Sequence, residues 1–266
     1  MTTHSKNELL IDVQNVNLTY DKVILRDVNF QIHNIVRPGL NQGQVISLIG
    51  RSGIGKTQLF KILAGMVAPT SGEVKIGLDQ HPVQAGDVGV VAQNYILFNH
   101  RTVLENLKIA MRHNTEVATE SEKDALIADY ADKFDLTEHL KKYPMHLSGG
   151  QRQRASIIQQ VLTGNRFILL DEPFSGLDAL MIDRVLNLLL QVSTLHELNT
   201  LVIISHDIEN SLAVSDTAFI LAREKDKEGA TITETLDLIK MELAWNPQIR
   251  EDKNFQHLVA EIKHKI

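Results

Sequence analysis

VISLIGRSGIGKT, residues 45–57, is the stretch that decides the fold of this chain. Residues 45–49 are apolar apart from one serine, which is typical of a strand buried on both faces in a parallel sheet. Residues 50–57 match the pattern G-x-x-x-x-G-K-[ST], and a helix-forming run at 58–66 follows. Strand, loop and helix in this order predict a turn whose backbone N–H groups wrap around phosphates.

The residues of this loop have different predicted tasks. Lys56 would reach the β- and γ-phosphates of a nucleoside triphosphate, and the Thr57 hydroxyl would ligate Mg²⁺. The alternative, a glycine-rich turn with an exposed lysine, does not require every fixed residue of the pattern to be present. The predicted nucleotide-binding residues of the loop are Gly50, Arg51, Ser52, Gly53, Ile54, Gly55, Lys56 and Thr57.

Short apolar runs alternate with amphipathic stretches along the rest of the chain. Strands that alternate with helices predict an α/β fold with a mainly parallel sheet. Further buried strands are expected at 88–92, 167–170, 201–204 and 217–221, and helices at 121–134 and 178–198.

Two regions depart from this alternation. Residues 9–20 and 23–32 alternate apolar and polar side chains, which predicts a pair of N-terminal strands, followed by a loop at 34–43. Residues 112–146 have helical patterns and no buried strand, which predicts a helical subdomain. Ahead of them, Thr102 and Glu105 have the spacing of a capping box.

Composition excludes several classes of protein. The 266 residues include no cysteine, which rules out disulfides, thiolate metal sites and cysteine nucleophiles. A formal net charge of −6 leaves no basic excess to neutralise phosphates, so we expect no nucleic-acid partner. The first residues lack the apolar core of a signal peptide, and no run of about 18 apolar residues occurs. The sequence therefore predicts a cytoplasmic protein.

An acidic pair follows another predicted buried strand, in RFILLDEP at 166–173. Asp171 at the strand end can hold Mg²⁺ through its water shell, and Glu172 is placed to orient or deprotonate an attacking water. Taken alone, Glu172 could equally cap the next turn. Together with the phosphate loop, the pair predicts binding and hydrolysis of a nucleoside triphosphate.

LSGGQRQR, residues 147–154, is a second glycine-rich turn that runs into a helix. Such a turn can bind an anion through free N–H groups and the helix dipole, but it has no lysine and no adjacent Mg²⁺ ligand. It therefore predicts half of a phosphate site, which another cradle must complete.

As a set, these motifs resemble those of the ATP-binding-cassette (ABC) ATPases, whose signature motif LSGGQ matches. The resemblance implies a P-loop NTPase core with a mainly parallel sheet, an N-terminal antiparallel β subdomain and an inserted helical subdomain at about 94–162. It also implies that two cassettes pair head to tail, so that the signature of one closes over the ATP of the other. The residues expected to contact ATP or the partner there are Ser148, Gly149, Gly150, Gln151 and Asp178.

The resemblance assigns roles to three further residues. Gln93, in VVAQNYILF, matches the glutamine that senses the γ-phosphate and Mg²⁺, and His206, in LVIISHD, matches the switch histidine. Tyr20, in LTYDKV, matches the aromatic residue that stacks on adenine. The expected catalytic residues are then Glu172, His206 and Gln93, and the expected Mg²⁺ ligands are Thr57, Gln93 and Asp171.

The resemblance covers about residues 9–225 and leaves 226–266 as a short, partly helical C-terminal extension. Two departures stand out within the matched part. Lys56 is followed by Thr-Gln rather than the usual Ser-Thr, which preserves the hydroxyl. The span from Tyr20 to Gly50 is longer than usual, and we assign the excess to the loop at 34–43.

The function implied is that of the ATP-hydrolysing subunit of an ABC transporter, peripheral on the inner face of the cell membrane. The expected cofactors are ATP and Mg²⁺. The expected partners are a second cassette, as a homodimer, transmembrane permease subunits and, for an importer, a solute-binding protein. An importer is favoured over a soluble ABC ATPase without a permease and over lipid or protein extraction; a P-loop kinase, a GTPase and a degenerate binding module fit less well. Cargo and direction stay open.

Residues 95–98, Tyr-Ile-Leu-Phe, form an apolar cluster directly after Gln93. Four large apolar residues in a row cannot all face inward on a loop, and exposed apolar clusters tend to mark interaction sites. By resemblance, this segment lines the groove where a helix of the permease docks.

Overall fold

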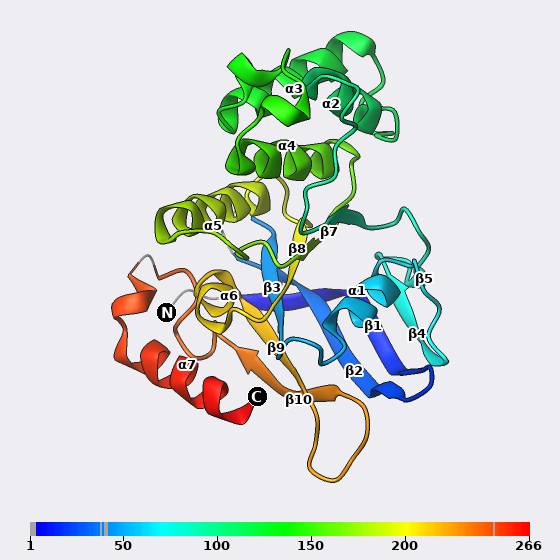
Figure 1. Ribbon diagram of the computed structural model, residues 1–266, viewed down its shortest axis with the longest axis vertical. Coiled ribbons are helices and arrows are strands. Elements are labelled where there is room, and N and C mark those ends of the chain that lie inside the picture. The colour runs from blue at the N-terminus through cyan, green and yellow to red at the C-terminus, as the bar shows by residue number, and fades with distance from the viewer. Residues whose placement is uncertain (1–3, 38, 40–41, 247) are drawn as a thin grey trace.

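The computed structural model describes residues 4–37, 39, 42–246 and 248–266. Three helices, α2 (Val103–Met111), α3 (Glu120–Lys133) and α4 (Gly149–Leu162), stack above two β-sheets in Figure 1. The α/β fold class predicted from the sequence, with one antiparallel and one mostly parallel sheet and a helical region between strands, is confirmed.

The larger sheet contains the phosphate-loop strand at its centre. Its strands are β3 (Gln44–Ile49), β6 (Gly89–Val91), β7 (Phe167–Asp171), β8 (Thr200–Ser205), β9 (Thr217–Ala222) and β10 (Thr231–Asp237). Their order is β10-β9-β3-β8-β7-β6, all parallel except β10, which pairs antiparallel with β9. Every residue of β3 and β8 is buried, as expected of strands covered on both faces.

The smaller sheet is antiparallel and has the order β2-β1-β4-β5. It consists of β1 (Ser5–Thr19), β2 (Val23–Val36), β4 (Ser71–Ile76) and β5 (His81–Pro82). The predicted N-terminal pair of strands is confirmed. The prediction that a loop begins at residue 34 is wrong, because β2 continues to Val36. The end of β2 pairs with the first residues of β1, with Ser5 opposite Val36, and the predicted first strand lacked these partners. Residues 38, 40 and 41 of that loop lie outside the described residues.

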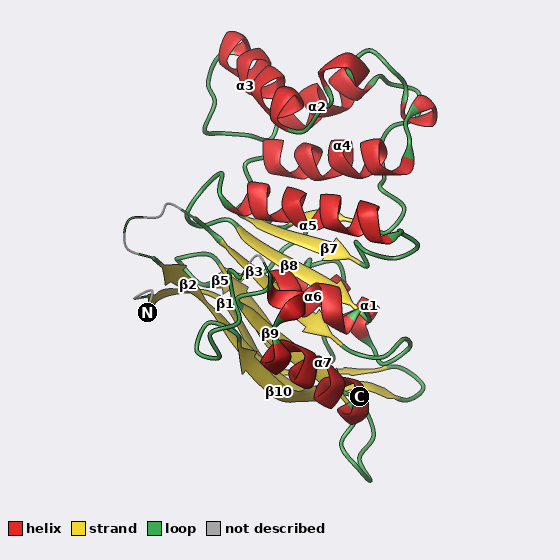
Figure 2. Cartoon of the chain, turned by 90° about the vertical axis from the view of Figure 1, so that its left-hand side faces the viewer, coloured by secondary structure: helices red, strands yellow, loops and turns green. Residues whose placement is uncertain are grey.

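Helices cover both faces of the larger sheet (Figure 2). Helix α1 (Lys56–Leu63) packs with Ile46 and Leu48 of β3 and with the smaller sheet. Helices α5 (Ala179–Ser193) and α6 (Ile208–Val214) pack in the cores that contain Val45 and Ile49, on the opposite face. Helix α1 ends before the predicted residue 66 because Gly65 adopts a left-handed φ of 67°.

Capping boxes begin all three helices of the helical region. The predicted box at α2 is confirmed: Glu105 N donates to Thr102 Oγ1 at 3.3 Å, and Thr102 N donates to Glu105 Oε2 at 2.7 Å. Thr119 begins α3, and Ser148 begins α4, in the same way. Two short 3₁₀ turns, η1 (Thr137–His139) and η2 (Pro144–His146), connect α3 to α4. Among the described residues, no helix has the length and apolar character needed to cross a bilayer.

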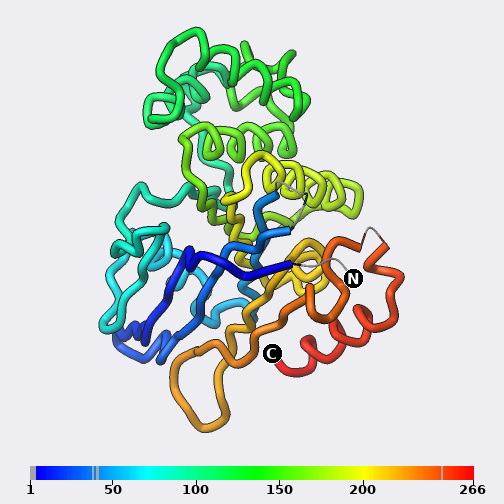
Figure 3. The backbone as a smooth tube through the Cα atoms, turned by 180° about the vertical axis from the view of Figure 1, so that it is seen from behind, coloured from blue at the N-terminus to red at the C-terminus, as the bar shows by residue number. Residues whose placement is uncertain are grey.

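The C-terminal part of the chain packs against the larger sheet. After β10 it forms η3 (Ile249–Glu251) and α7 (Lys253–Lys265), and a third core joins Phe255 and Ile262 of α7 to Ile49 and Ile220 of the sheet. Figure 3 shows the first strand running close to this part, and Lys6 Nζ lies 2.9 Å from Asp237 Oδ2 of β10. Residues 226–266 therefore contribute strand β10 to the larger sheet and helix α7, which packs against one face of that sheet.

A buried ion pair connects the end of β2 to the start of β9. Arg37 Nη2 donates to Asp216 Oδ1 at 2.6 Å, and both side chains are at most 4% exposed. Trp245 Nε1 donates to the same oxygen at 2.6 Å, and Val45 N donates to Asp216 Oδ2 at 2.8 Å. The Arg37 guanidinium also lies over the Trp245 ring, 3.8 Å from its centroid. Burial raises the pKa of Asp216, and Arg37 and the N–H donors oppose that rise.

Candidate functional site

The phosphate loop lies between β3 and α1, as predicted. Gly55 has φ of 122°, and a Cβ there would lie 3.1 Å from Leu25 Cδ2, so the position requires glycine. A Cβ on Gly50 would lie 2.5 Å from the carbonyl oxygen of Leu221. No side chain caps the N-terminus of α1. Its first N–H groups, together with the helix dipole, therefore suit an anionic ligand.

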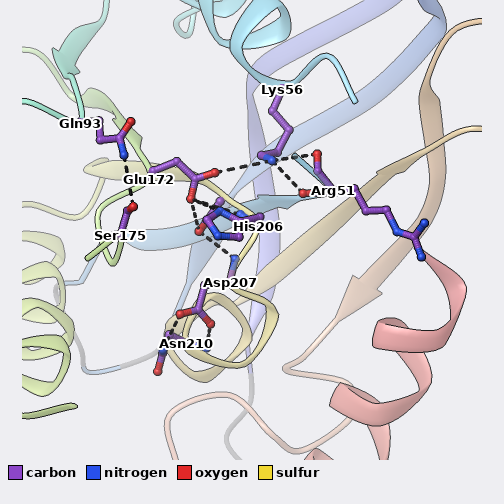
Figure 4. A network of polar contacts seen from close by, with 10 residues as sticks. Arg51, Lys56, Gln93, Glu172, Ser175, His206, Asp207 and Asn210 are labelled. Carbon is purple, nitrogen blue, oxygen red and sulfur yellow. Dashed lines mark hydrogen bonds and ion pairs between the residues drawn. The ribbon is translucent and has the colours of Figure 1, made fainter. Parts of the chain in front are cut away.

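Lys56 extends back across this loop (Figure 4). Its Nζ donates to the carbonyl oxygens of Gly50 at 2.8 Å and Arg51 at 3.1 Å, and it lies 3.6 Å from Glu172 Oε1. Burial lowers the pKa of Lys56, and the charges of Glu172 and Asp171 partly offset that effect. The ammonium group is thus held at the point where an incoming phosphate would offer a further acceptor.

A cavity of about 450 Å³ opens beside the loop. It brings together residues from the phosphate loop, from the segment after β6 that contains Gln93, from the acidic end of β7 and from the turn after β8. Its lining residues are Ile24, Ser52, Gly53, Gly55, Lys56, Thr57, Gln58, Gln93, Asp171, Glu172, Ser175 and His206. Nine of them were predicted as site residues, which makes this cavity the candidate nucleotide site.

Glu172 is held in a constrained position. It has a left-handed φ of 49°, and its backbone N–H donates to the carbonyl oxygen of Ile204 at 2.8 Å. Its Oε2 accepts from Ser205 Oγ at 2.8 Å and from the backbone N–H of His206 at 3.3 Å, and it lies 2.8 Å from His206 Nδ1. Burial raises the pKa of Glu172, but these hydrogen bonds outweigh it and leave the pKa below the usual value. The carboxylate is therefore ionised and oriented, as a base requires.

The predicted Mg²⁺ ligands Thr57, Gln93 and Asp171 face the same cavity. Burial and the neighbouring Glu172 raise the pKa of Asp171 in this structure, whereas a bound cation would favour its charged form. Gln93 Nε2 donates to Ser175 Oγ at 3.2 Å. A hydroxyl, an amide oxygen and one carboxylate fit a Mg²⁺ ion that takes its other ligands from phosphates and water.

Of the predicted nucleotide-binding residues in and near the phosphate loop, four do not line this cavity: Tyr20, Gly50, Arg51 and Ile54. Tyr20 is 57% exposed, does not line the cavity, and its hydroxyl lies 3.4 Å from Oε1 of the lining residue Gln58. The Arg51 side chain points away from Lys56 in Figure 4, and with Ile54 it lines a separate cavity of about 400 Å³ against the end of α7. For Arg51, only the backbone carbonyl faces Lys56.

The second glycine-rich turn, residues 147–154, lies in the helical region at the start of α4 and is called the α4 cradle below. It contributes no residue to the 450 Å³ cavity. Ser148 is the N-cap of α4, with Gly149 and Gly150 in the first turn. Asp178 caps α5 by accepting from Met181 N at 2.9 Å. The predicted residues Ser148, Gly149, Gly150, Gln151 and Asp178 are thus placed apart from the phosphate loop of their own chain.

Ser205 was not predicted as a site residue, and Ser175 was expected, by resemblance, only as the start of the loop 175–178 that crosses the dimer interface, yet both are polar neighbours of the site. Ser205 Oγ donates a hydrogen bond to Glu172, and Ser175 Oγ accepts one from Gln93. Their positions, directly before His206 and in the loop after Glu172, were the available signal. For Ser205 this signal is weak, because serine is common in turns for other reasons.

Comparison with known proteins assigns this arrangement of motifs to a family. The family model described as "ABC transporter" matches residues 33–175. The bicarbonate transport ATP-binding protein CmpD of Synechocystis sp. is 33% identical over 79% of this chain and 73% of its own length. The spermidine/putrescine import ATP-binding protein PotA of Fusobacterium nucleatum is 33% identical over 85% of this chain but only 58% of its own length.

Solved structures show the same fold. CbiO1 from Clostridium perfringens, described as part of the ABC transporter complex cbiONQ, superposes with a TM-score of 0.72 at 20% identity, over 88% of this chain and 91% of its own. The dimeric cassette MJ0796 bound to ADP and Pi superposes with a TM-score of 0.67 at 23% identity, over 86% of this chain and 99% of its own.

Proposed function

Because the chain belongs to the ABC transporter family, we propose that it binds and hydrolyses ATP as the cassette subunit of an importer, at the cavity beside Lys56. The observation that carries the proposal is the meeting of the phosphate loop, Asp171, Glu172, Gln93 and His206 around one cavity. The similar proteins CmpD and PotA are named for transport of bicarbonate and import of spermidine or putrescine, which favours an importer over a soluble cassette.

Each side chain of the cavity has a proposed task. Lys56 and the N-terminus of α1 bind the phosphates, and Mg²⁺ held by Thr57, Gln93 and Asp171 would neutralise charge on the β- and γ-phosphates. Glu172 accepts a proton from, or orients, the attacking water. His206, already beside Glu172, contacts the γ-phosphate.

ATP turnover tests this proposal directly. The purified chain is expected to hydrolyse ATP in the presence of Mg²⁺, and Lys56→Ala is expected to weaken nucleotide affinity about ten- to a hundredfold, because a charge-assisted phosphate contact is worth roughly 1.5–3 kcal/mol. Titration calorimetry measures the affinity. Lys61→Ala, in the same helix but outside the cavity, is the matched control. Unchanged affinity of Lys56→Ala would remove this cavity as the ATP site.

The separation of Ser148 from the cavity of its own chain supports a second cassette as partner, in a homodimer. In this proposal the N-terminus of α4 closes over the ATP bound to the partner. Permease subunits hold the pair at the inner face of the membrane, and a solute-binding protein delivers the cargo.

Ser148→Arg is expected to block ATP-dependent dimerisation and ATP hydrolysis while the isolated chain binds ATP normally. The bulky cation would occupy the α4 cradle but lies outside the cavity that holds Lys56. Thr119→Arg is the matched control, because Thr119 is the N-cap of α3 with the same capping box, so both variants lose about 1 kcal/mol of capping. Gel filtration with ATP reads the dimer. Weaker ATP binding by the Ser148→Arg monomer would place Ser148 in its own chain's site instead.

The segment after Gln93 offers an exposed apolar surface for the permease. Ile96 is 67% exposed and Phe98 48% exposed, whereas Leu97 is buried and Tyr95 half-buried. Ile96→Glu and Phe98→Glu are expected to abolish transport in reconstituted vesicles without changing basal ATP turnover of the soluble chain. Leu78→Glu, at a 60% exposed leucine between β4 and β5, is the control. Normal transport by both variants would exclude this surface.

A further inference from the structure

The side chain of Gln151 is bound at both ends of its amide group. The backbone N–H of Ser148 donates to Gln151 Oε1 at 3.0 Å, and Gln151 Nε2 lies 3.0 Å from His139 Nε2. The opposite orientation of the amide would place an NH₂ group against the N–H of Ser148, two donors facing each other. The oxygen therefore faces Ser148, and the NH₂ group faces His139.

This orientation determines the hydrogen-bonding role of His139. An amide NH₂ can only donate, so His139 Nε2 must be an acceptor, and a neutral imidazole then carries its proton on Nδ1. His139 Nδ1 is buried and has no partner among the described residues. The ring thus presents a single acceptor to a single donor, at the edge of the capping box that begins α4.

His139 also lies in a segment with a fixed position. It belongs to η1, where its backbone N–H donates to Leu136 O at 2.8 Å. Directly after it, the carbonyl oxygens of Leu140 and Lys142 accept from the first N–H groups of α2, both at 2.9 Å. The ring is therefore carried by backbone that is hydrogen-bonded to a neighbouring helix, which suits it to hold a flexible glutamine in one rotamer.

We infer that His139, as the neutral Nδ1–H tautomer, is a positioning residue that holds the Gln151 amide and thereby the shape of the α4 cradle. This inference rests on the proposed function of Ser148 and the glycines beside it. It concerns the free chain, however, so part of its test is independent of ATP hydrolysis.

Three variants separate positioning from simple packing. His139→Leu keeps an apolar body but removes the acceptor, His139→Gln restores an acceptor oxygen, and His146→Leu changes an exposed histidine of η2. For His139→Leu, the protein concentration that gives half-maximal ATP turnover is expected to rise about three- to tenfold, the size of one lost hydrogen bond. ATP affinity of the monomer stays unchanged. His139→Gln and His146→Leu behave like wild type.

A nitrogen-detected NMR spectrum gives the second readout. Under conditions where the histidines are neutral, the signal lost in His139→Gln is expected to belong to the Nδ1–H tautomer. The Nε2–H tautomer, or equal loss of dimerisation in His139→Leu and His139→Gln, would overturn the inference. If wild type shows no ATP turnover at any concentration, the proposed function fails, while the tautomer still decides whether His139 accepts from Gln151.

Discussion

Glu172→Gln is expected to lower ATP turnover by a factor of about 10²–10⁴ while ATP binding persists, because removal of a general base typically costs that much. The amide oxygen of glutamine can still accept from Ser205 and from the N–H of His206, so the local structure should survive. It has no basic lone pair for the proton of an attacking water. The variant is therefore expected to accumulate as an ATP-bound dimer, since the closed state cannot be resolved by hydrolysis.

Phosphate release measures the loss of ATP turnover, and gel filtration in ATP measures the accumulation of the dimer. Glu228→Gln, at an exposed glutamate in the loop between β9 and β10, is the control and should match wild type in both. Turnover near the wild-type rate in Glu172→Gln would mean that another group activates the water.

Arg37→Met is expected to lower the free energy of unfolding by about 3–5 kcal/mol, which is the largest effect on stability that we expect from a single side chain. The substitution leaves the Asp216 carboxylate buried without its counter-charge, although the indole N–H of Trp245 still donates to it. Methionine keeps an apolar stem of similar length but removes the guanidinium that lies over the Trp245 ring, so the loss reports the ion pair together with this cation–π contact. Urea unfolding followed by circular dichroism measures it.

A double-mutant cycle separates this pair from ordinary packing. Asp216→Asn alone should be strongly destabilising, whereas the combination with Arg37→Met should recover much of the loss, because no unpaired charge remains. Lys133→Met breaks the exposed ion pair with Asp129 and should cost less than about 1 kcal/mol. Additive losses in the double variant would contradict the ion-pair account.

The sequence predicted the site best where one short, continuous segment of chain determines both the backbone conformation and the functional side chains. The glycines and Lys56 of the phosphate loop follow from one short pattern between a buried strand and a helix, and they lie there in the structure. The acidic pair at the end of β7 was predictable for the same reason, because a strand buried on both faces needs a continuous apolar run. The roles of these residues stay predictions until they are measured.

Elements whose partners are far away in the sequence were harder to predict. In β10 only Leu236 is buried, and the sequence of this strand has little apolar pattern that would predict it. The strand forms by pairing with β9, and this pairing is not visible in the local sequence. The extension of β2 depends on the first residues of β1 in the same way. His139 could not be recognised at all, since its contact with Gln151 depends on the packing of η1 against α4.

The third core, between α7 and the sheet, bears on which segments of the chain unfold together. Phe255 and Ile262 share apolar neighbours with Ile49 of β3, the strand that leads into the phosphate loop. Segments that bury side chains in one cluster tend to unfold as a single cooperative unit. In hydrogen-exchange experiments, the amides of α7 should therefore exchange at a rate close to those of β3 and β9 rather than as a fraying end. A ligand that slows exchange in β3 should then slow it in α7 as well, at a distance from the bound phosphates.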